Sequence, residues 1–327
     1  MSRVFVTGGS GVVGRALVER LVSGGDEVVA LARSQVSEET LRSLGASPVR
    51  CELWDERGLS EAMQGCSVVY NVAGVNTLCV EDPKPMLRAN VEAPPVVVRA
   101  AAQAGVGRFV HTSSAATIGE ASGVVGREDT PHRGWYLSTY ERTKTEGERA
   151  VFEAGRQTGV EVVCVNPSSV QGPGRSGGTA RFLLAYLDGR LKAFVPTNVS
   201  LVDISDCAEG HVLAAQRGVA GERYLLNGIA LTITEALALA GEVAGVSRKP
   251  RMLPRQVAVA GAWAAEHGFR LARRKPPVCR EMVRTLLHGH RYDGSRAERE
   301  LGLRYTEPRE TLRRTVDWAR AEGLLRS

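Results

Sequence analysis

The segment that is most diagnostic of the fold reads Val4-Phe5-Val6-Thr7-Gly8-Gly9-Ser10-Gly11-Val12-Val13-Gly14. Its apolar first residues predict a short buried strand, its glycines predict a tight turn, and residues 15–22 predict an amphipathic helix. In such a unit Gly8 permits the sharp turn, Gly11 lets the backbone approach a pyrophosphate, and Gly14 lets the helix pack closely on the strand. The free amides at the start of the helix then face the phosphates. The segment therefore predicts a dinucleotide-binding loop, although its spacing is Gly-x-x-Gly-x-x-Gly rather than the commoner Gly-x-Gly-x-x-Gly.

Strand and helix signals continue to alternate through the first half of the chain. Apolar segments with strand character recur at residues 27–32, 48–51, 67–72, 108–112 and 160–165. Six strands separated by helical segments predict an α/β fold with a doubly wound parallel Rossmann sheet. We expect a dinucleotide-binding domain over residues 1–170 and a smaller, mostly helical substrate lobe over residues 171–327. Strands near 202–204 and 223–226 are expected to return to the main sheet.

The segment around Asn90 carries a local irregularity. Pro94 and Pro95 follow Asn90 and precede the apolar run 96–102. Proline inside a helix removes a backbone hydrogen bond and forces a kink. The segment is therefore predicted to be either two helices or one helix that bends beside Asn90.

The composition is that of a cytoplasmic globular enzyme. The chain has 327 residues, and 43% of them are hydrophobic, which supports a sizeable core. The longest nearly unbroken apolar run, residues 257–265, is shorter than the roughly 18 residues of a membrane span, and no signal peptide is expected before the first strand. The six cysteines are scattered without a Cys-x-x-Cys pair. They therefore predict free thiols in a reducing compartment, and neither a disulfide framework nor a zinc or other metal site is indicated.

The net charge of +6 is unevenly distributed. From Arg248 onward there are 19 Lys and Arg against 9 Asp and Glu. A basic region can bind nucleic acid, a membrane surface or an acidic substrate. Here, however, arginine alternates with glutamate at helical spacing, as in residues 295–301, which favours solvated helix faces. We therefore expect no nucleic acid and no membrane among the partners.

Two side chains on one predicted helix suggest proton chemistry. Tyr140 and Lys144 are four residues apart and share a helix face. A tyrosine usually has a pKa near 10, and a nearby cation lowers it. Such a pair is common on surface helices, but Ser113 and Ser114 follow the strand 108–112, and ligands of open α/β sheets bind beyond the carboxyl ends of strands. The pattern predicts a proton donor at that edge.

Taken together, these segments resemble those of the extended short-chain dehydrogenases/reductases, the NAD(P)-dependent epimerase/dehydratase superfamily, and within it the dihydroflavonol-reductase-like branch. The resemblance covers nearly the whole chain. The matching segments are residues 7–14, 71–74, 90–91, 111–115, 140–144, 166–174, 202–208 and 292–295.

The resemblance implies roles for individual residues. It makes Tyr140 the acid/base, Lys144 its electrostatic partner and the anchor of the cofactor ribose, and Ser114 the hydrogen-bond partner of the reacting oxygen. Ser114 is preferred to Ser113 because family members place the active serine five residues before a glycine that matches Gly119. Asn90 is expected either to hold a proton-relaying water or to stabilise the helix bend.

The resemblance also implies the cofactor contacts. Arg33 lies 19 residues after Gly14, where an NAD enzyme usually carries an acidic residue, and an arginine there pairs with a 2′-phosphate. This predicts NADP, with NAD as the alternative, while Glu52 in place of the usual Asp leaves the adenine contact open. The predicted cofactor-binding residues are Thr7, Gly8, Gly9, Ser10, Gly11, Val12, Val13, Gly14, Arg33, Ser34, Glu52, Leu53, Val72, Ala73, Gly74, Tyr140, Lys144, Pro167 and Val170.

The expected activity is the NADP-dependent reduction of an aldehyde or ketone to an alcohol, or its reverse. A nucleotide-sugar epimerase with retained NAD and a non-catalytic dinucleotide sensor are the alternatives. Dehydration of a sugar is disfavoured, because Ala115 and Ala116 follow Ser114 where sugar dehydratases carry an acidic pair. The apolar lobe suggests a hydrophobic small-molecule substrate, and the helices near Asn90 and Tyr140 suggest a homodimer.

Overall fold

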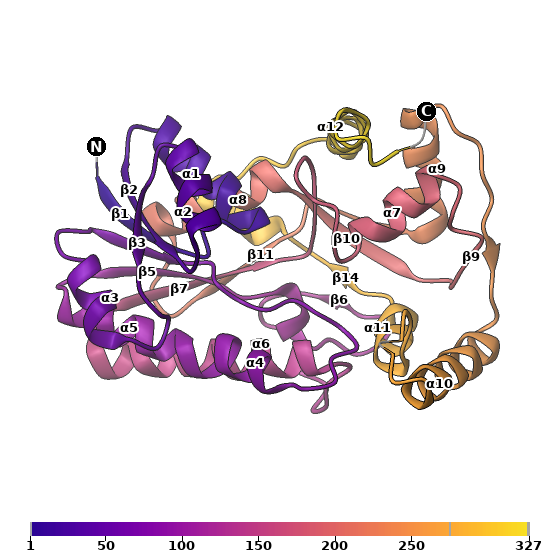
Figure 1. Ribbon diagram of the computed structural model, residues 1–327, viewed down its shortest axis with the longest axis horizontal. Coiled ribbons are helices and arrows are strands. Elements are labelled where there is room, and N and C mark those ends of the chain that lie inside the picture. The colour runs from indigo at the N-terminus through magenta and orange to yellow at the C-terminus, as the bar shows by residue number, and fades with distance from the viewer. Residues whose placement is uncertain (1, 275, 326–327) are drawn as a thin grey trace.

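A computed structural model of the chain describes residues 2–274 and 276–325 (Figure 1). Its main sheet consists of β1 (Arg3–Thr7), β2 (Glu27–Ala32), β3 (Ser47–Arg50), β4 (Val68–Asn71), β5 (Arg108–Thr112), β7 (Glu161–Pro167) and β11 (Arg223–Leu226). These strands lie in the order β11-β7-β5-β4-β1-β2-β3, and every neighbouring pair is parallel. The six strands predicted in the first half of the chain are all present. The predicted doubly wound α/β sheet is therefore confirmed.

Helices cover both faces of this sheet, because successive residues of a strand point to opposite sides. Val4 and Val6 of β1 are buried in one apolar cluster, and Phe5 between them is buried in the other. The covering helices are α1 (Val12–Ser23), α2 (Gln35–Ser43) and α8 (Ile204–Arg217) on the first face, and α3 (Glu56–Ala62), α5 (Ala93–Gln103) and α6 (Thr139–Thr158) on the second. Figure 1 shows α1 and α8 on one side of the sheet and α5 and α6 on the other.

The two late strands behave differently from each other. Residues 223–226 form β11 and join the main sheet at its edge beside β7, as predicted. The prediction for residues 202–204 is wrong. Strand β10 (Asn198–Asp203) instead pairs with β8 (Ser169–Gln171) and β12 (Ile229–Thr232) in a separate three-stranded sheet, and Ile204 already begins α8. The reason is that β11 occupies the edge of β7, so β10 pairs with the neighbouring β8.

A second lobe lies on the right of Figure 1. Its helices are α7 (Ala180–Leu187), α9 (Ile233–Ala244), α10 (Arg255–Leu271), α11 (Arg280–His288) and α12 (Pro308–Ala321). They share an apolar core of their own, which includes Phe194, Leu237 and Val316. The short strand β14 (Arg291–Tyr292) pairs with β6 (Val125–Gly126) and so links the lobe to the chain after β5. None of the helices in the described residues combines the length and apolar composition needed to cross a membrane.

The segment around Asn90 is one bent helix rather than two. Helix α4 (Lys84–Leu87) continues through a wide π-helical turn (Arg88–Glu92) into α5, with helical backbone angles at the junctions. Pro94 and Pro95 lie just after the π-helical turn, which interrupts the regular hydrogen-bond ladder where their N–H groups are missing. Gly147 of α6 packs against this bend, since a Cβ atom there would lie 1.9 Å from the Asn90 carbonyl oxygen.

The expectation of six free thiols is wrong for two of them. Cys79, in the loop after β4, is joined by a disulfide to Cys279, which caps the N-terminus of α11. The two residues are 200 positions apart in the chain. Local cysteine spacing carries no information about so distant a pair, because only the packing of the lobe against this loop brings them together. The free thiols are those of Cys51, Cys66, Cys164 and Cys207.

Candidate active site

The glycine-rich segment forms a tight turn between β1 and α1. Gly8 has φ +69°, a conformation that favours glycine, and a Cβ atom there would lie 2.7 Å from the Ala73 backbone nitrogen. A Cβ atom on Gly14 would lie 2.0 Å from the Gly8 carbonyl oxygen, so only glycine allows α1 to start this close to the turn. Gly11 caps α1 without a side chain of its own and is exposed. The turn therefore leaves the amides of a helix N-terminus open to a phosphate group.

Thr7 connects this turn to the end of β4. Its hydroxyl donates to Asn71 Oδ1 at 2.6 Å and accepts from the Ala73 backbone N–H at 3.1 Å. Asn71 Nδ2 in turn lies 3.0 Å from His111 Nδ1 on β5. The carboxyl ends of β1, β4 and β5 are thus held in register by buried polar contacts, at the point where the order of the strands reverses.

Ser114 and Tyr140 meet at this edge of the sheet. Ser114 follows β5 and caps a short 3-10 helix, η2 (Ala115–Ile118), while Tyr140 lies in the first turn of α6. Ser114 acts on the hydroxyl group of Tyr140 to lower its pKa. The hydroxyl of Ser113 instead donates to the Glu148 carboxylate, behind the strand end. The structure therefore brings Ser114, and not Ser113, to the tyrosine.

The electrostatics around Tyr140 differ from the sequence interpretation. Burial raises the pKa of its hydroxyl, whereas the hydrogen bond from Ser114 and the positive charge of Arg175 act to lower it. Lys144, the cation expected to act on the tyrosine, donates instead from Nζ to the Thr112 carbonyl oxygen at 2.7 Å. Burial lowers the pKa of Lys144 to about 8. The cation whose charge acts on Tyr140 is therefore Arg175.

Arg175 was not among the predicted site residues. It lies in the loop between β8 and α7, and burial lowers the pKa of its guanidinium group. Its Nε atom is buried without a hydrogen-bond partner among the described residues, and none of their carboxylates forms an ion pair with it. The sequence signal was its place directly after Gly172-Pro173-Gly174, at the end of a segment that resembles the cofactor-flanking part of the family.

Asn90 makes three hydrogen bonds within the protein. Its Oδ1 atom accepts from the Val75 N–H at 2.8 Å, and its Nδ2 atom donates to the Val75 carbonyl at 2.9 Å and to Thr143 Oγ1 at 3.1 Å. These contacts fasten the loop after β4 to α6. Gly74 lies beside this cluster, since a Cβ atom there would be 3.1 Å from Asn90 Oδ1 and 3.8 Å from Lys144 Nζ. The three hydrogen bonds of Asn90 favour the role of stabilising the helix bend, and the water relay stays a prediction.

A buried carboxylate behind the site was also missed by sequence reasoning. Glu148 Oε2 accepts from Thr117 Oγ1 at 3.0 Å and from Asn166 Nδ2 at 2.6 Å, in addition to Ser113. Its Oε1 atom lies 3.1 Å from Arg223 Nη1 on β11. This network fixes the ends of β5, β7 and β11 and thereby holds the residue next to Ser114 in place.

The remaining predicted cofactor residues lie around the same edge. Arg33 and Ser34 follow β2 and are exposed, and Ser34 caps α2 by accepting from the Ser37 N–H at 3.2 Å. Arg33 makes no hydrogen bond or ion pair with any other residue that the structure describes. Leu53 is buried while Glu52 is exposed. The predicted residues Val72, Ala73, Pro167 and Val170 lie at or beyond the ends of β4 and β7.

A cavity lies outside this group of residues. It has a volume of about 690 Å³ and opens between the loop at Cys79, the start of α6 at Thr139, and helices α10 and α11. Glu281 of α11 accepts hydrogen bonds there from the backbone N–H groups of Cys79 and Thr139. Neither Ser114 nor Tyr140 lines it, so the cavity adjoins the candidate site without containing its hydroxyl groups.

Comparison with known proteins agrees with the fold. A model of the NAD dependent epimerase/dehydratase family matches residues 4–226. The putative dihydroflavonol 4-reductase of Synechocystis sp. is 31% identical, over 99% of this chain and 96% of the relative. Sterol demethylase protein B of Methylococcus capsulatus is also 31% identical, over 98% and 99%. The crystal structure of gox2253 superimposes with a TM-score of 0.87 at 29% identity, with 100% of both chains covered.

The family match extends from the first strand to β11, so it includes the glycine turn, Ser114, Tyr140 and Lys144. The alignments with these two relatives span almost the whole length of each relative. The chain therefore belongs to the NAD dependent epimerase/dehydratase family within the extended short-chain dehydrogenases/reductases, and is an enzyme of the oxidoreductase or epimerase type that uses a nicotinamide dinucleotide.

Proposed function

We propose that the protein is an NADP-dependent oxidoreductase that interconverts an aldehyde or ketone and the corresponding alcohol. The observation that carries the proposal is that Ser114 and Tyr140 meet at the carboxyl edge of the sheet, where Ser114 acts to lower the pKa of the tyrosine hydroxyl. Together they offer a carbonyl oxygen one proton donor and one further hydrogen bond. The likeness to a putative dihydroflavonol 4-reductase supports a reductase rather than an epimerase.

Reduction of a carbonyl requires a hydride at the carbon and a proton at the oxygen. When bound, the nicotinamide ring supplies the hydride, which carries both electrons. Tyr140 transfers its phenolic proton to the oxygen, and Ser114 hydrogen-bonds that oxygen while negative charge develops on it. The phenolate left on Tyr140 is stabilised by Ser114 and by the positive charge of Arg175. In the reverse direction the same phenolate removes the proton of the alcohol.

The residues around the glycine turn fit a dinucleotide. The close approaches at Gly8 and Gly14 leave a cradle that any side chain would fill, and the amides after Gly11 would hold the pyrophosphate. Lys144 would hold the ribose next to the nicotinamide. Arg33 supports the choice of NADP, because it is exposed at the end of β2 without an internal partner and is free to pair with the 2′-phosphate.

Arg175 supports a substrate that carries an anionic group, such as a carboxylate, close to the reacting carbonyl. A guanidinium group that is half-buried without a carboxylate partner loses hydration, and an anion from the substrate would restore its hydrogen bonds. Its charge already acts on Tyr140, so an anion bound to it would lie near the reacting oxygen. A hydrophobic oxo acid satisfies both this arginine and the apolar lobe.

The direct test is a panel of aldehydes and ketones, with and without a carboxylate near the carbonyl, incubated with NADPH or with NADH. The expected result is oxidation of NADPH that depends on the substrate, followed by nicotinamide absorbance. Tightly retained NAD, with no net turnover on any carbonyl compound, would favour an epimerase instead. Reversible binding of NADPH without turnover on any member of the panel would favour a dinucleotide sensor.

A further inference from the structure

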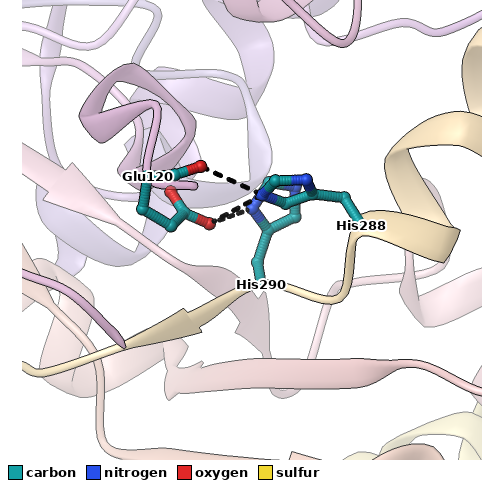
Figure 2. A group of neighbouring side chains, drawn as sticks. All are labelled: Glu120, His288 and His290. Atoms are coloured by element: carbon teal, nitrogen blue, oxygen red, sulfur yellow. Dashed lines mark hydrogen bonds and ion pairs between the residues drawn. The ribbon is translucent and has the colours of Figure 1, made fainter. Parts of the chain in front are cut away.

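Three side chains with metal-binding atoms converge where the lobe meets the chain after β5 (Figure 2). Glu120 comes soon after η2, His288 ends α11, and His290 directly precedes β14. Glu120 Oε1 lies 2.6 Å from His290 Nδ1 and 3.6 Å from His288 Nε2. One ligand atom from each of the three residues lies within 4.8 Å of the other two. Figure 2 shows both imidazole rings on the same side of the Glu120 carboxylate.

The cluster is largely buried, and its ring nitrogens have hydrogen-bond partners: His288 Nε2 lies 3.1 Å from the Glu120 carbonyl oxygen, and His290 Nδ1 lies 3.0 Å from the Tyr292 hydroxyl. One carboxylate oxygen of the cluster, however, has no partner in the described part of the chain. The side chains of Glu120, His288 and His290 are 1%, 5% and 19% exposed. Both histidines approach the same carboxylate oxygen, Oε1, while Oε2 is buried without a partner among the described residues. A buried acceptor without a partner is costly, and one proton shared between Oε1 and a histidine leaves that cost in place.

The charges around the cluster favour the binding of a further cation. Glu141 is a second buried carboxylate; burial raises its pKa, and it forms an ion pair with Arg133. Arg133 also donates from Nη1 to the Glu120 carbonyl oxygen at 3.1 Å. With neutral histidines, two carboxylates and one arginine give the group a net charge of −1. Either a proton on a histidine or a bound metal ion can compensate this charge.

We propose that Glu120, His288 and His290 bind a divalent transition-metal ion such as Zn²⁺. Two imidazoles and one carboxylate form a common ligand set for zinc with one position left for water. Bonds of about 2.0–2.2 Å at tetrahedral angles place the ligand atoms roughly 3.3 Å apart. The two separations from Glu120 Oε1, 2.6 and 3.6 Å, lie on either side of that value, and the two histidine nitrogens lie within 4.8 Å of each other, so the side chains would have to adjust by an ångström or so to admit the ion.

An ion at this position would act on the structure rather than on the reacting carbonyl. It would bond the loop after η2 to the segment between α11 and β14, next to the β6–β14 pair. Cysteine spacing gives no sign of this site, because none of its three ligands is a cysteine. The His-x-His pair at 288 and 290 was the local signal, but its carboxylate partner is about 170 residues earlier in the chain.

The proposal is tested first on the full-length, metal-free protein by titration with Co²⁺. We expect one equivalent of Co²⁺ to bind and to produce the visible absorption bands of a tetrahedral or five-coordinate site, and Zn²⁺ to displace it. A chelator should also lower the thermal unfolding temperature of the zinc-loaded protein. If the folded wild-type chain takes up no stoichiometric metal, the cluster holds only a proton and the proposal is wrong.

Variants then locate the site. Glu120→Gln and His290→Gln should each weaken Co²⁺ binding by roughly 10-fold or more, since even changes behind a ligand cost that much. His267→Gln is the control, because His267 is exposed on α10 away from the cluster and should leave binding unchanged. Circular dichroism checks that each variant is folded. Equal Co²⁺ affinity in folded Glu120→Gln and His290→Gln would place the metal elsewhere and overturn the assignment.

Discussion

Ser114 acts on Tyr140 to lower the pKa of its hydroxyl group, although one residue caps the 3-10 helix after β5 and the other lies in the first turn of α6. Each residue is fixed by its own local structure. Ser138 caps α6 by accepting from the Glu141 N–H at 3.0 Å, and the Glu148 network holds the end of β5. The pair is therefore set in place before a substrate arrives, which is the condition for efficient proton transfer.

Replacing Tyr140 by phenylalanine should remove the proton donor while keeping the ring. We expect turnover to fall by about 10²- to 10⁴-fold, the usual contribution of proton transfer, with NADPH binding nearly unchanged. Steady-state rates and fluorescence titration of the cofactor measure the two effects. Tyr136→Phe is the matched control, because Tyr136 is also partly buried but contacts the His132 ring edge-to-face instead. Near-normal turnover in Tyr140→Phe would exclude the acid/base role.

Substitution of the two neighbouring serines should separate catalysis from stability. Ser114→Ala removes the hydrogen bond to the reacting oxygen, and we expect the rate of the chemical step to fall roughly 10-fold or more. Ser113→Ala removes only a contact of the buried Glu148, so it should lower the thermal unfolding temperature with a smaller effect on rate. Single-turnover kinetics and thermal melts measure these quantities. The opposite pattern would mean that Ser113 is the catalytic serine.

Arg33→Asp should shift the cofactor preference towards NADH. The substitution removes a charge-assisted contact to the 2′-phosphate and offers a carboxylate to the ribose hydroxyls. Hydrogen bonds to charged groups are worth roughly 1.5 to 3 kcal/mol, which corresponds to about a 10- to 150-fold loss of NADPH affinity. Fluorescence titrations measure the dissociation constants for NADPH and NADH. Arg57→Asp, on α3, is the control. Unchanged dissociation constants in Arg33→Asp would remove the main support for NADP.

Arg175→Met should change the pH dependence of alcohol oxidation. This direction needs the Tyr140 phenolate, so the rate rises as pH increases through the pKa of the tyrosine. Because the charge of Arg175 lowers that pKa, its removal should move the rising limb to higher pH, and Arg175→Lys should restore part of the shift.

The same variant tests the substrate proposal. KM for a carboxylated carbonyl compound should increase in Arg175→Met, while KM for an uncharged analogue should change little. An unchanged pH profile would show that the guanidinium does not act on Tyr140. A change in pH profile without any selective effect on the carboxylated compound would retain the electrostatic role and reject the anionic substrate.

The features that could be predicted from the sequence depend on residues that are close together in the chain. The glycine turn, the strands and the pair Tyr140 and Lys144 each depend on residues a few positions apart, so spacing and apolar periodicity were sufficient. Three features depend on contacts between distant segments: the position of Arg175 beside Tyr140, the Glu148 network, and the pairing of β10 with β8 and β12. Their partners lie on different elements, so local spacing could not reveal these contacts. The contact of Lys144 with the Thr112 carbonyl was missed for the same reason.

The bond between Cys79 and Cys279 turns most of the chain into a covalent ring. Every peptide bond between these residues, including those of the exposed loop around Gly174 to Gly178, lies within it. A protease that cuts this loop once, for example after Arg175, opens the ring but releases no fragment. The two pieces would migrate together on a denaturing gel until a thiol reductant is added, and only then would the nicked protein separate into its N-terminal and C-terminal halves.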